Sequence, residues 1–401
     1  MNILWVKIGG LWPLNMGGRL RSYHIISELS QRHRLTVLTT HQPGEDPAEV
    51  ARQLPLCARV VSFPFAAPKA GGVRFAAALA RSWLSPSPVD LLKWRVPVLR
   101  AEAERILRNG AVDLCVADFL HAVSNVPLNS SVPVVLFAHN VEHMIWKRLA
   151  ENERRLWRRA LLEVEWRKLR RSERHACVGS RMVIAVSETD AASLAESAPA
   201  AELRSIPTGV DTAYFNADGT PEGKAHLVFS GAMDWFPNED AILFFTAEIL
   251  PLIREEVPEA TVTVVGRNPS ARLRKAAADA GVRITGTVDD VRSFIDEANV
   301  YVVPLRIGGG TRLKIFEALS MGKAVVSTSV GAEGLPLTEG QHYLRADAPK
   351  DFSHAVVSLL RDPHRRKALG NAGRGLVRAR YSWERVAREF EATCEEALLK
   401  R

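Results

Sequence analysis

Residues 308–319 have the sequence Gly-Gly-Gly-Thr-Arg-Leu-Lys-Ile-Phe-Glu-Ala-Leu, and a strand-like segment, Ala-Val-Val-Ser-Thr, follows at 324–328. The three glycines leave backbone N–H groups open to approach from outside. Thr311 fits a helix N-cap, which would direct the positive end of the helix dipole at the loop. Arg312 and Lys314 add two cations there, and Glu317 lies further along the helix. This combination suits a diphosphate at the loop and a hydroxyl-bearing group at the carboxylate.

The cations in this segment favour a binding role over a simple solvated turn. A helix dipole favours acids in the first turn, so two cations there oppose the local preference, and such conflicts are typical of functional sites. The loop is not a P-loop, because no Gly-Lys-Ser/Thr follows the glycines. The predicted phosphate-binding residues of the segment are Gly308, Gly309, Gly310, Thr311, Arg312 and Lys314.

The length and composition predict a two-domain globular chain. At 401 residues the chain exceeds one ordinary core, and its 47% hydrophobic and 24% charged residues are ordinary for a soluble protein. Residues 1–7 are apolar too briefly for a signal peptide, and no run reaches the ~20 apolar residues of a membrane span. Four widely spaced cysteines indicate reduced thiols without metal spacing. We therefore expect a cytoplasmic protein.

The net charge of +8 is concentrated between residues 145 and 175, where 11 Lys or Arg accompany 5 Glu and three Trp. One interpretation is a long solvated helix with a basic face, packed through Leu149, Leu156, Ala160 and Val164. The other is a surface that lies on anionic lipid at the inner face of the membrane, with Trp at the interface. The first is slightly favoured, since a packed helix also needs Trp and Leu. No nucleic-acid partner is expected, because no known binding motif accompanies the charge.

Strand-like and helix-like segments alternate in both halves of the chain, which predicts parallel sheets with helical crossovers. Strands are expected at 3–8, 34–40, 60–63, 112–117, 132–138, 182–186, 203–206, 227–230, 261–265, 282–284, 300–303, 324–327 and 342–344. Helices are expected at 19–30, 102–108, 239–253, 269–280, 291–297, 312–320, 350–361, 363–380 and 383–400. The predicted fold class is α/β, with two doubly wound Rossmann-like domains, 1–215 and 216–401. Ligands of such sheets bind beyond the carboxyl ends of the strands, so a cleft between the domains is the expected site.

Residues 16–19, 137–142, 206–215 and 308–318, in this order along the chain, resemble segments of the GT-B retaining glycosyltransferases of the glycosyl transferases group 1 family. Residues 16–19 (Met-Gly-Gly-Arg) are similar to the family's glycine-rich first loop, and 137–142 (Phe-Ala-His-Asn-Val-Glu) to its His-Asn segment. Residues 206–215 are close to its interdomain hallmark. The C-terminal half carries similar strings at 231–233, 264–266, 286–290, 308–318 and 381–383. The resemblance covers nearly the whole chain and implies that the last helix returns to the N-terminal domain.

The resemblance also implies roles for individual residues. Glu317 matches a glutamate that usually holds the nucleotide ribose, and His139 a histidine near the donor sugar and the acceptor. Gly17 and Gly18 match a loop that approaches the donor phosphates, and Asp289 lies in the loop expected near the base. By this resemblance the first domain is the acceptor side and the second binds the nucleotide sugar.

Two departures separate the chain from the family pattern. The first glutamate of the paired-glutamate motif, eight residues before Glu317, is replaced by Gly309. The Arg and Lys that often follow the first strand of the second domain are also missing, since residues 227–253 contain neither. Because a departing diphosphate needs positive charge, we expect Arg312 and Lys314 to bind it.

The expected activity is transfer of a sugar from a nucleoside diphosphate sugar to a hydroxyl of a glycan or lipid-linked acceptor. The resemblance implies retention at the anomeric carbon without a metal, and the sequence shows no Asp-x-Asp motif or cluster of metal-ligand spacing. No cofactor is expected beyond the donor itself. Two alternatives stay open: a nucleotide-sugar epimerase on the same architecture, and a non-catalytic homologue that binds glycan or nucleotide.

Overall fold

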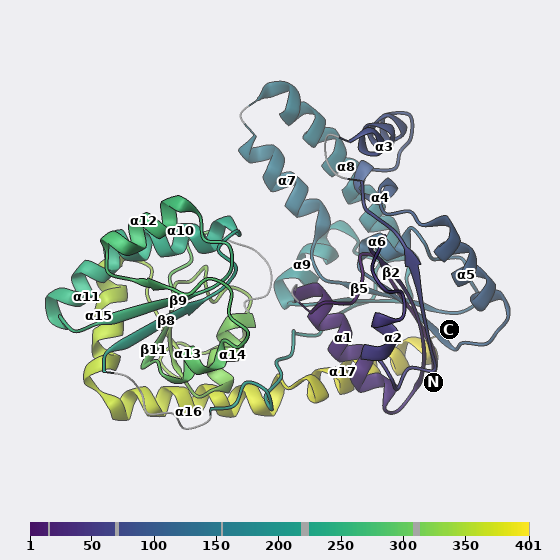
Figure 1. Ribbon diagram of the computed structural model, residues 1–401. Coiled ribbons are helices and arrows are strands. Elements are labelled where there is room, and N and C mark those ends of the chain that lie inside the picture. Colours follow the sequence, from purple (N-terminus) through teal and green to yellow (C-terminus); the bar gives the residue numbers. More distant parts are fainter. Residues whose placement is uncertain (15–16, 69–71, 154, 218–223, 308–312, 401) are drawn as a thin grey trace. The chain divides into compact units, whose positions relative to one another are not determined.

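The computed structural model describes the chain except for residues 15–16, 69–71, 154, 218–223, 308–312 and 401 (Figure 1). The chain divides into two compact units. Unit 1 comprises Met1–Pro207 and Val386–Arg401, and unit 2 comprises Thr208–Arg385. The sequence-based boundary after residue 215 differs from this division, which falls between Pro207 and Thr208.

Unit 1 is built on a seven-stranded parallel sheet with the strand order β3-β2-β1-β4-β5-β6-β7. The central strand β1 is buried on both faces, as its run of apolar residues requires in a covered parallel sheet. The order reverses between β1 and β4, which pair in register from Ile3 with Leu114 to Lys7 with Asp118. The strands are β1 (Asn2–Lys7), β2 (Arg34–His41), β3 (Arg59–Pro64), β4 (Leu114–Asp118), β5 (Val134–Ala138), β6 (Met182–Ala185) and β7 (Leu203–Ser205).

Helices connect the strands of unit 1 and cover its sheet (Figure 1). They are α1 (Gly17–Ser30), α2 (Glu49–Gln53), α3 (Val73–Trp83), α4 (Val89–Leu92), α5 (Pro97–Arg108), α6 (Leu120–Val123), α7 (Glu142–Asn152), α8 (Leu156–Gly179) and α9 (Glu188–Ser197). The last helix, α17 (Trp383–Leu399), begins in unit 2 and packs in unit 1 from residue 386. There the ring centroid of Phe390 lies 5.5 Å from the ring centroid of Trp5 in β1. The predicted return of the last helix to the first domain is therefore confirmed.

Unit 2 repeats the plan with a six-stranded parallel sheet in the order β10-β9-β8-β11-β12-β13. The strands are β8 (His226–Ser230), β9 (Thr261–Val265), β10 (Arg283–Ile284), β11 (Val300–Val303), β12 (Ala324–Ser327) and β13 (Leu344–Arg345). The helices are α10 (Phe236–Phe244), the π-helical turn η1 (Phe245–Ile249), α11 (Leu250–Glu256), α12 (Ala271–Asp279), α13 (Arg292–Asp296), α14 (Leu313–Ser320), α15 (Pro349–Arg361) and α16 (Pro363–Arg380). The reversal lies between β8 and β11.

The fold class and the thirteen predicted strands are confirmed, with ends that shift by one or two residues. The single helix predicted at 239–253 is instead α10, η1 and α11, and Pro251 stands in the first turn of α11. Proline has no N–H for the helical ladder, which accounts for a break at this point. Among the described residues, no helix is both long enough and apolar enough to cross a bilayer.

The basic segment 145–175 is not one helix, and its predicted packing is wrong. The helices α7 and α8 pack against each other, with the break between Asn152 and Leu156 (Figure 1). Of the four residues predicted to face the core, Leu149, Leu156 and Val164 are 54%, 82% and 50% exposed, and Ala160 is exposed too. The buried positions of α8 are Glu165, Leu169, Glu173, Ala176 and Cys177.

Candidate functional site

The polar centre of unit 1 lies at the carboxyl edge of its sheet, where the strand order reverses and ligands of such sheets bind. Lys7 ends β1, Asp118 ends β4, and both side chains are buried. The Lys7 Nζ lies 3.4 Å from Asp118 Oδ1, and the Trp5 indole N–H donates to Asp118 Oδ2 at 2.8 Å. Burial lowers the pKa of Lys7. Burial alone would raise the pKa of Asp118, but Lys7 and His139 hold it well below its usual range.

His139 follows β5 and joins this centre. Its Nε2 lies 2.8 Å from Asp118 Oδ1, and Arg21 of α1 donates from Nη1 to its Nδ1 at 2.8 Å. A guanidinium only donates hydrogen bonds, so Nδ1 accepts and the ring proton resides on Nε2. Burial lowers the pKa of His139 to about 3, and the positive charges of Arg21 and Lys7 act in the same direction. The predicted residue therefore lies at the sheet edge as a neutral imidazole, with Nδ1 bonded to Arg21 and Nε2 close to Asp118 but without a hydrogen bond among the described residues.

Phe119 connects His139 with the glycine-rich start of α1. Its ring stacks on the imidazole with centroids 3.7 Å apart, and its φ of 74° is a strained value for a bulky residue. A Cβ placed on Gly18 would lie 2.6 Å from the Phe119 ring, so only glycine fits there. Gly17 and Gly18 are the first two residues of α1, and the first turn of a helix is a place where backbone N–H groups can bind an anion.

Sequence reasoning missed Lys7, Asp118 and Phe119. One signal could have found the first two. A charged residue that directly ends a buried apolar strand, as Lys7 and Asp118 do, needs a partner at the sheet edge.

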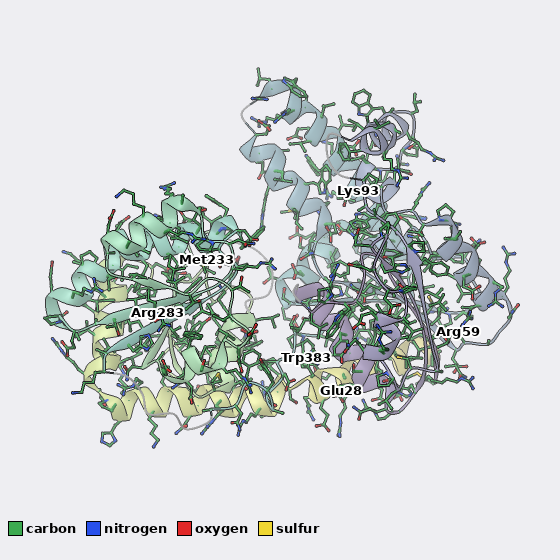
Figure 2. All side chains as sticks on the ribbon, in the orientation of Figure 1. Glu28, Arg59, Lys93, Met233, Arg283 and Trp383 are labelled. Carbon is green, nitrogen blue, oxygen red and sulfur yellow. The ribbon has the colours of Figure 1, made fainter. Side chains whose placement is uncertain are left out.

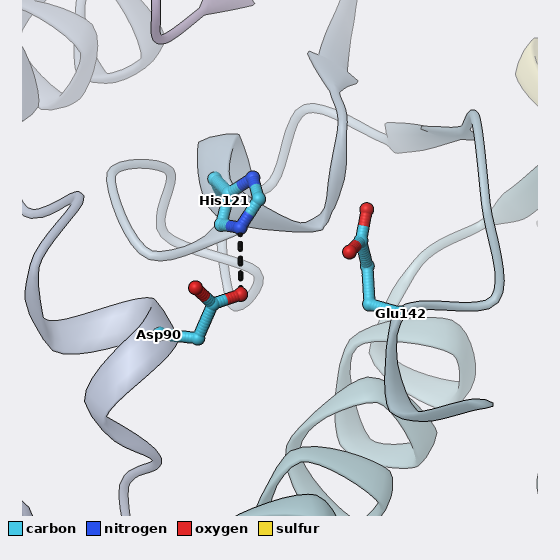
Figure 3. Close-up of side chains that lie close together, drawn as sticks. All are labelled: Asp90, His121 and Glu142. Carbon is cyan, nitrogen blue, oxygen red and sulfur yellow. Dashed lines mark hydrogen bonds and ion pairs between the residues drawn. The ribbon is translucent and has the colours of Figure 1, made fainter. Parts of the chain in front are cut away.

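A second cluster in unit 1 gathers Asp90 of α4, His121 of α6 and Glu142 at the start of α7 (Figure 3). One ligand atom of each lies within 4.8 Å of the others, and His121 Nε2 is 3.0 Å from Asp90 Oδ2. The sequence shows no cluster of metal-ligand spacing, and these three side chains come together only in the fold. The three residues are far apart in the chain, so no spacing pattern reveals them.

The charge balance of this cluster is met without an ion. The Lys93 ammonium lies 2.5 Å from Asp90 Oδ1, and the Asn140 amide donates to Glu142 at 3.3 Å. Burial by itself would raise the pKa of Asp90, but His121 and Lys93 lower it to about 2. Burial raises the pKa of Glu142, which favours its neutral form. The donor set resembles a divalent-cation site, but Lys93 already neutralises its most acidic member.

In unit 2 the predicted cation Lys314 lies at the carboxyl end of β8. Its Nζ donates to Asn238 Oδ1 of α10 at 2.8 Å and stands 4.0 Å from the centroid of the Phe229 ring. A Cβ on Gly231 would approach Nζ to 2.7 Å, so the backbone comes close to the ammonium. Met233, labelled in Figure 2, is buried in the same turn. The remaining predicted residues of the loop, Gly308, Gly309, Gly310, Thr311 and Arg312, lie outside the described residues.

Glu317 lies one turn after Lys314 on α14. Ile315, Phe316 and Leu319 around it are fully buried, whereas Glu317 keeps part of its surface accessible. Within the described ranges its carboxylate forms no hydrogen bond or ion pair. Burial raises the pKa of Glu317 to about 7, and Lys314 opposes the rise. The carboxylate is therefore available to accept hydrogen bonds from hydroxyl groups.

Two further loops at this edge carry the other candidates of unit 2. Asp289 is exposed after β10, and its neighbour Asp290 pairs with Arg292 at 2.6 Å. After β9, Arg267 Nε lies 3.5 Å from Asp234 Oδ2. Unit 2 thus brings Lys314 and Glu317 together on one helix, and unit 1 brings His139 and Gly18 together through Phe119.

Two family models match most of the chain. The model of Glycosyltransferase Family 4 matches residues 17–214, and that of the Glycosyl transferases group 1 matches residues 224–362. Solved structures share the fold over the full length. Sucrose-phosphate synthase from Thermosynechococcus elongatus has a TM-score of 0.73 at 16% identity, covering 100% of both chains. HepE from Anabaena, solved in complex with UDP, has a TM-score of 0.65 at 13% identity, covering 99% of this chain and 100% of its own.

Several curated relatives match less than half of this chain. The phosphatidyl-myo-inositol mannosyltransferase of Mycobacterium tuberculosis is 29% identical over 199 residues, which are 46% of this chain and 52% of the relative. The chain thus spans about half the length of the curated relatives it matches first. An uncharacterised 44.6 kDa protein from the cps region of Klebsiella pneumoniae is 22% identical over 391 residues, 94% of this chain and 95% of its own.

The two doubly wound units, each with charged residues at the reversal of its sheet, have the GT-B fold. With both family models, this shows that the chain belongs to the glycosyl transferases group 1, a family of glycosyltransferases.

Proposed function

We propose that this chain transfers a sugar from a nucleoside diphosphate sugar to a hydroxyl of a glycan or lipid-linked acceptor. The observation that carries the proposal is the Lys314 ammonium, held by Asn238 at the carboxyl end of β8 with Glu317 one turn away. A cation beside the backbone at the point where the strand order of the sheet reverses suits a diphosphate. A partly buried carboxylate suits ribose hydroxyls.

The proposed reaction retains the anomeric configuration and needs no metal. The bond between the anomeric carbon and the diphosphate oxygen breaks, and the electron pair leaves with the diphosphate. The acceptor oxygen bonds to the same face of the carbon, and its proton passes to the departing phosphate oxygen. Lys314 and, from its place in the sequence, Arg312 would stabilise the negative charge that develops on the leaving group.

Unit 1 would supply the acceptor side. The neutral His139, fixed by Arg21 and stacked on Phe119, presents a rigid wall at the carboxyl edge of the sheet. Such a wall favours orientation of a substrate over proton transfer, because a histidine with a pKa of about 3 is a poor base near neutral pH.

A membrane surface is a further proposed partner. Nine of the sixteen exposed large apolar side chains of the described residues belong to or adjoin α3, α7 and α8, and the eight that precede residue 165 are here called the α3–α8 surface. They are Val73, Trp83, Leu84, Ile145, Leu149, Leu156, Trp157 and Val164. Their mixture with the basic residues of 145–175 is the composition of an interfacial surface. This supports a peripheral location beside a lipid-linked acceptor.

The test is thermal unfolding of the full chain with UDP, GDP, ADP and TDP, beside Glu317→Ala. A relative is named for GDP-mannose and HepE was solved with UDP, so both bases belong in the panel. A nucleotide at one hundred times its Kd should stabilise the wild type by about 2.7 kcal/mol, and the variant much less. No response to any nucleotide would refute the donor site and favour the non-catalytic homologue. Conversion of a donor sugar without an acceptor would identify the epimerase instead.

A further inference from the structure

A groove of about 750 Å³ opens on unit 1, and its lining does not include Lys7, Asp118 or His139 of the polar centre. Its walls are helix α3, the segment that follows β3, and residues 92–97. Four cations line it: Arg74, Arg81, Lys93 and Arg95. None of the described lining residues is acidic. A volume of this size accommodates a small ligand, and the charge calls for an anion.

Three of these cations are not neutralised within the described chain. Lys93 pairs with Asp90, but Arg74, Arg81 and Arg95 have no ion pair there. Arg81 and Arg95 also oppose each other, because burial and then the charge of Arg81 lower the pKa of Arg95. These three arginines are exposed around one groove and no carboxylate of the described residues neutralises them, so they are available to an anion. Planar guanidinium groups are suited to phosphate, which they bind through paired hydrogen bonds.

The walls between the arginines are apolar, with Phe65, Ala77 and Leu92 among them. Helix α3 carries the groove face at Arg74, Ala77, Ala78 and Arg81, a helical spacing. Next to this face, Val73 at its first position and Leu84 at its C-cap are 87% and 91% exposed. A free phosphate or a nucleic acid would not use this apolar surface, whereas an amphiphile would.

Helix α3 is held against helix α8 by buried polar contacts. Ser82 Oγ donates to Glu165 Oε1 of α8 at 2.7 Å, and Lys168 Nζ donates to the Ser82 carbonyl at 2.7 Å. Figure 1 shows α3 beside α8, and Lys93, which lines the groove, is labelled in Figure 2.

We propose that this groove binds the phosphate-bearing head of a membrane amphiphile, with the phosphate among Arg74, Arg81 and Arg95 and the apolar chain along α3. The inference rests on the proposed function and deepens it, because it assigns the acceptor to the class of lipid phosphates.

The test uses the full chain and two sets of phosphatidylcholine vesicles of equal surface charge. One set contains phosphatidic acid, which exposes a phosphomonoester, and the other contains phosphatidylglycerol, whose phosphate is a diester. The wild type should bind the phosphatidic acid vesicles more tightly. The double variant Arg81→Gln/Arg95→Gln should lose this preference, and its affinity for phosphatidic acid vesicles should fall roughly 30-fold, at about fivefold for each arginine.

A matched control removes the same charge outside the groove. Arg158→Gln/Arg159→Gln changes two exposed arginines of α8, and any loss of affinity should be equal for both vesicles, so that the preference remains. Unchanged affinity of the groove variant for both vesicles, or a loss of affinity no larger than that of the α8 variant, would overturn the proposal. Loss of the preference in the α8 variant alone would overturn it too.

The nucleotide response separates this proposal from the proposed function. The groove variant should keep the thermal stabilisation by nucleotide, and Glu317→Ala should keep the vesicle preference. Stabilisation by soluble glycerol phosphate to the same extent as by phosphatidic acid vesicles would overturn the assignment to an amphiphile. A vesicle preference without any nucleotide response would refute the donor site and not the groove.

Discussion

Arg21 of α1 donates a hydrogen bond of 2.8 Å to Nδ1 of His139 at the end of β5, and so fixes the tautomer of a buried neutral imidazole. The contact joins residues 118 positions apart at the carboxyl edge of one sheet. The contact holds the His139 ring in a fixed orientation at this edge. It also makes the free energy of unfolding depend on pH in a way that can be measured.

The free energy of unfolding should fall as the pH decreases from about 6.5. The unfolded histidine binds a proton near its ordinary pKa of 6.5, whereas the folded ring stays neutral down to its pKa of about 3. The contribution of His139 to the free energy of unfolding is therefore complete above pH 6.5 and is lost progressively below it. The slope is at most about 1.4 kcal/mol per pH unit. Urea unfolding of the wild type and of His139→Gln, which keeps one acceptor and one donor, measures the difference. Parallel profiles of the two proteins between about pH 6.5 and 4.5 would contradict the buried neutral ring.

Glu317 should have the opposite pH dependence. Its folded pKa of about 7 lies above the ordinary value of 4.5, so its contribution is complete below 4.5 and is lost as the pH rises through 7. Glu317→Gln should therefore gain stability relative to the wild type at alkaline pH, by roughly 1–2 kcal/mol because the side chain is partly exposed. Calorimetric unfolding at acidic and alkaline pH measures the gain. A constant difference across the pH range would show that the carboxylate is well solvated.

Gly18→Ala should destabilise unit 1 by about 1–3 kcal/mol, because the new Cβ overlaps the Phe119 ring that stacks on His139. The matched control is Gly375→Ala in α16, where nothing lies within 4 Å of the added Cβ. This change should be neutral or stabilising by about 0.4–1 kcal/mol. Urea unfolding of both variants decides the point, and equal effects would mean that Phe119 moves aside at little cost.

Lys314→Gln should weaken nucleotide binding by about 10- to 100-fold, the usual value of a charge-assisted hydrogen bond to an anion. Titration calorimetry with the nucleotide that stabilises the wild type measures the loss. Lys275→Gln on α12 is the control, because Lys275 is exposed and pairs only with Asp279, at 2.8 Å, among the described residues. Unchanged affinity in Lys314→Gln would assign the phosphates to other cations.

Transfer activity should persist in EDTA. The cluster of Asp90, His121 and Glu142 has the donors for a divalent cation, but Lys93 already balances Asp90. The assay compares EDTA with added Mn²⁺ or Mg²⁺ for the wild type and Glu142→Gln. Activation of the wild type by metal, absent in the variant, would assign a metal site to this cluster.

The sequence by itself determined the strands and hence the fold class. Runs such as Val134–Ala138 and Val300–Val303 are buried on both faces. A short run of apolar, largely β-branched residues between turn signals is a local pattern that predicts such a buried strand. The regularity of parallel crossovers then predicts the sheet edge, which is why His139, Lys314 and Glu317 were found at strand ends or in the helices that follow.

Only the tertiary structure decided the buried side of α8. The sequence predicts that Leu156 and Val164 face the core, but the buried residues include Glu165 and Glu173. Glu165 accepts from the N–H of Val89 at the start of α4, and Glu173 from that of Glu142 at the start of α7. These carboxylates satisfy free N–H groups of other helices, and no pattern within α8 contains that information.

The same reason explains why Lys7, Arg21 and Asp118 were not predicted together. Their contacts depend on the register of β1 with β4 and on the placement of α1, which bring distant residues to one edge. A buried charge is stable only with a partner, and that partner is defined by the fold and not by its neighbours in the chain. The sequence thus determined the strands and the fold class, and the tertiary structure determined which charges meet.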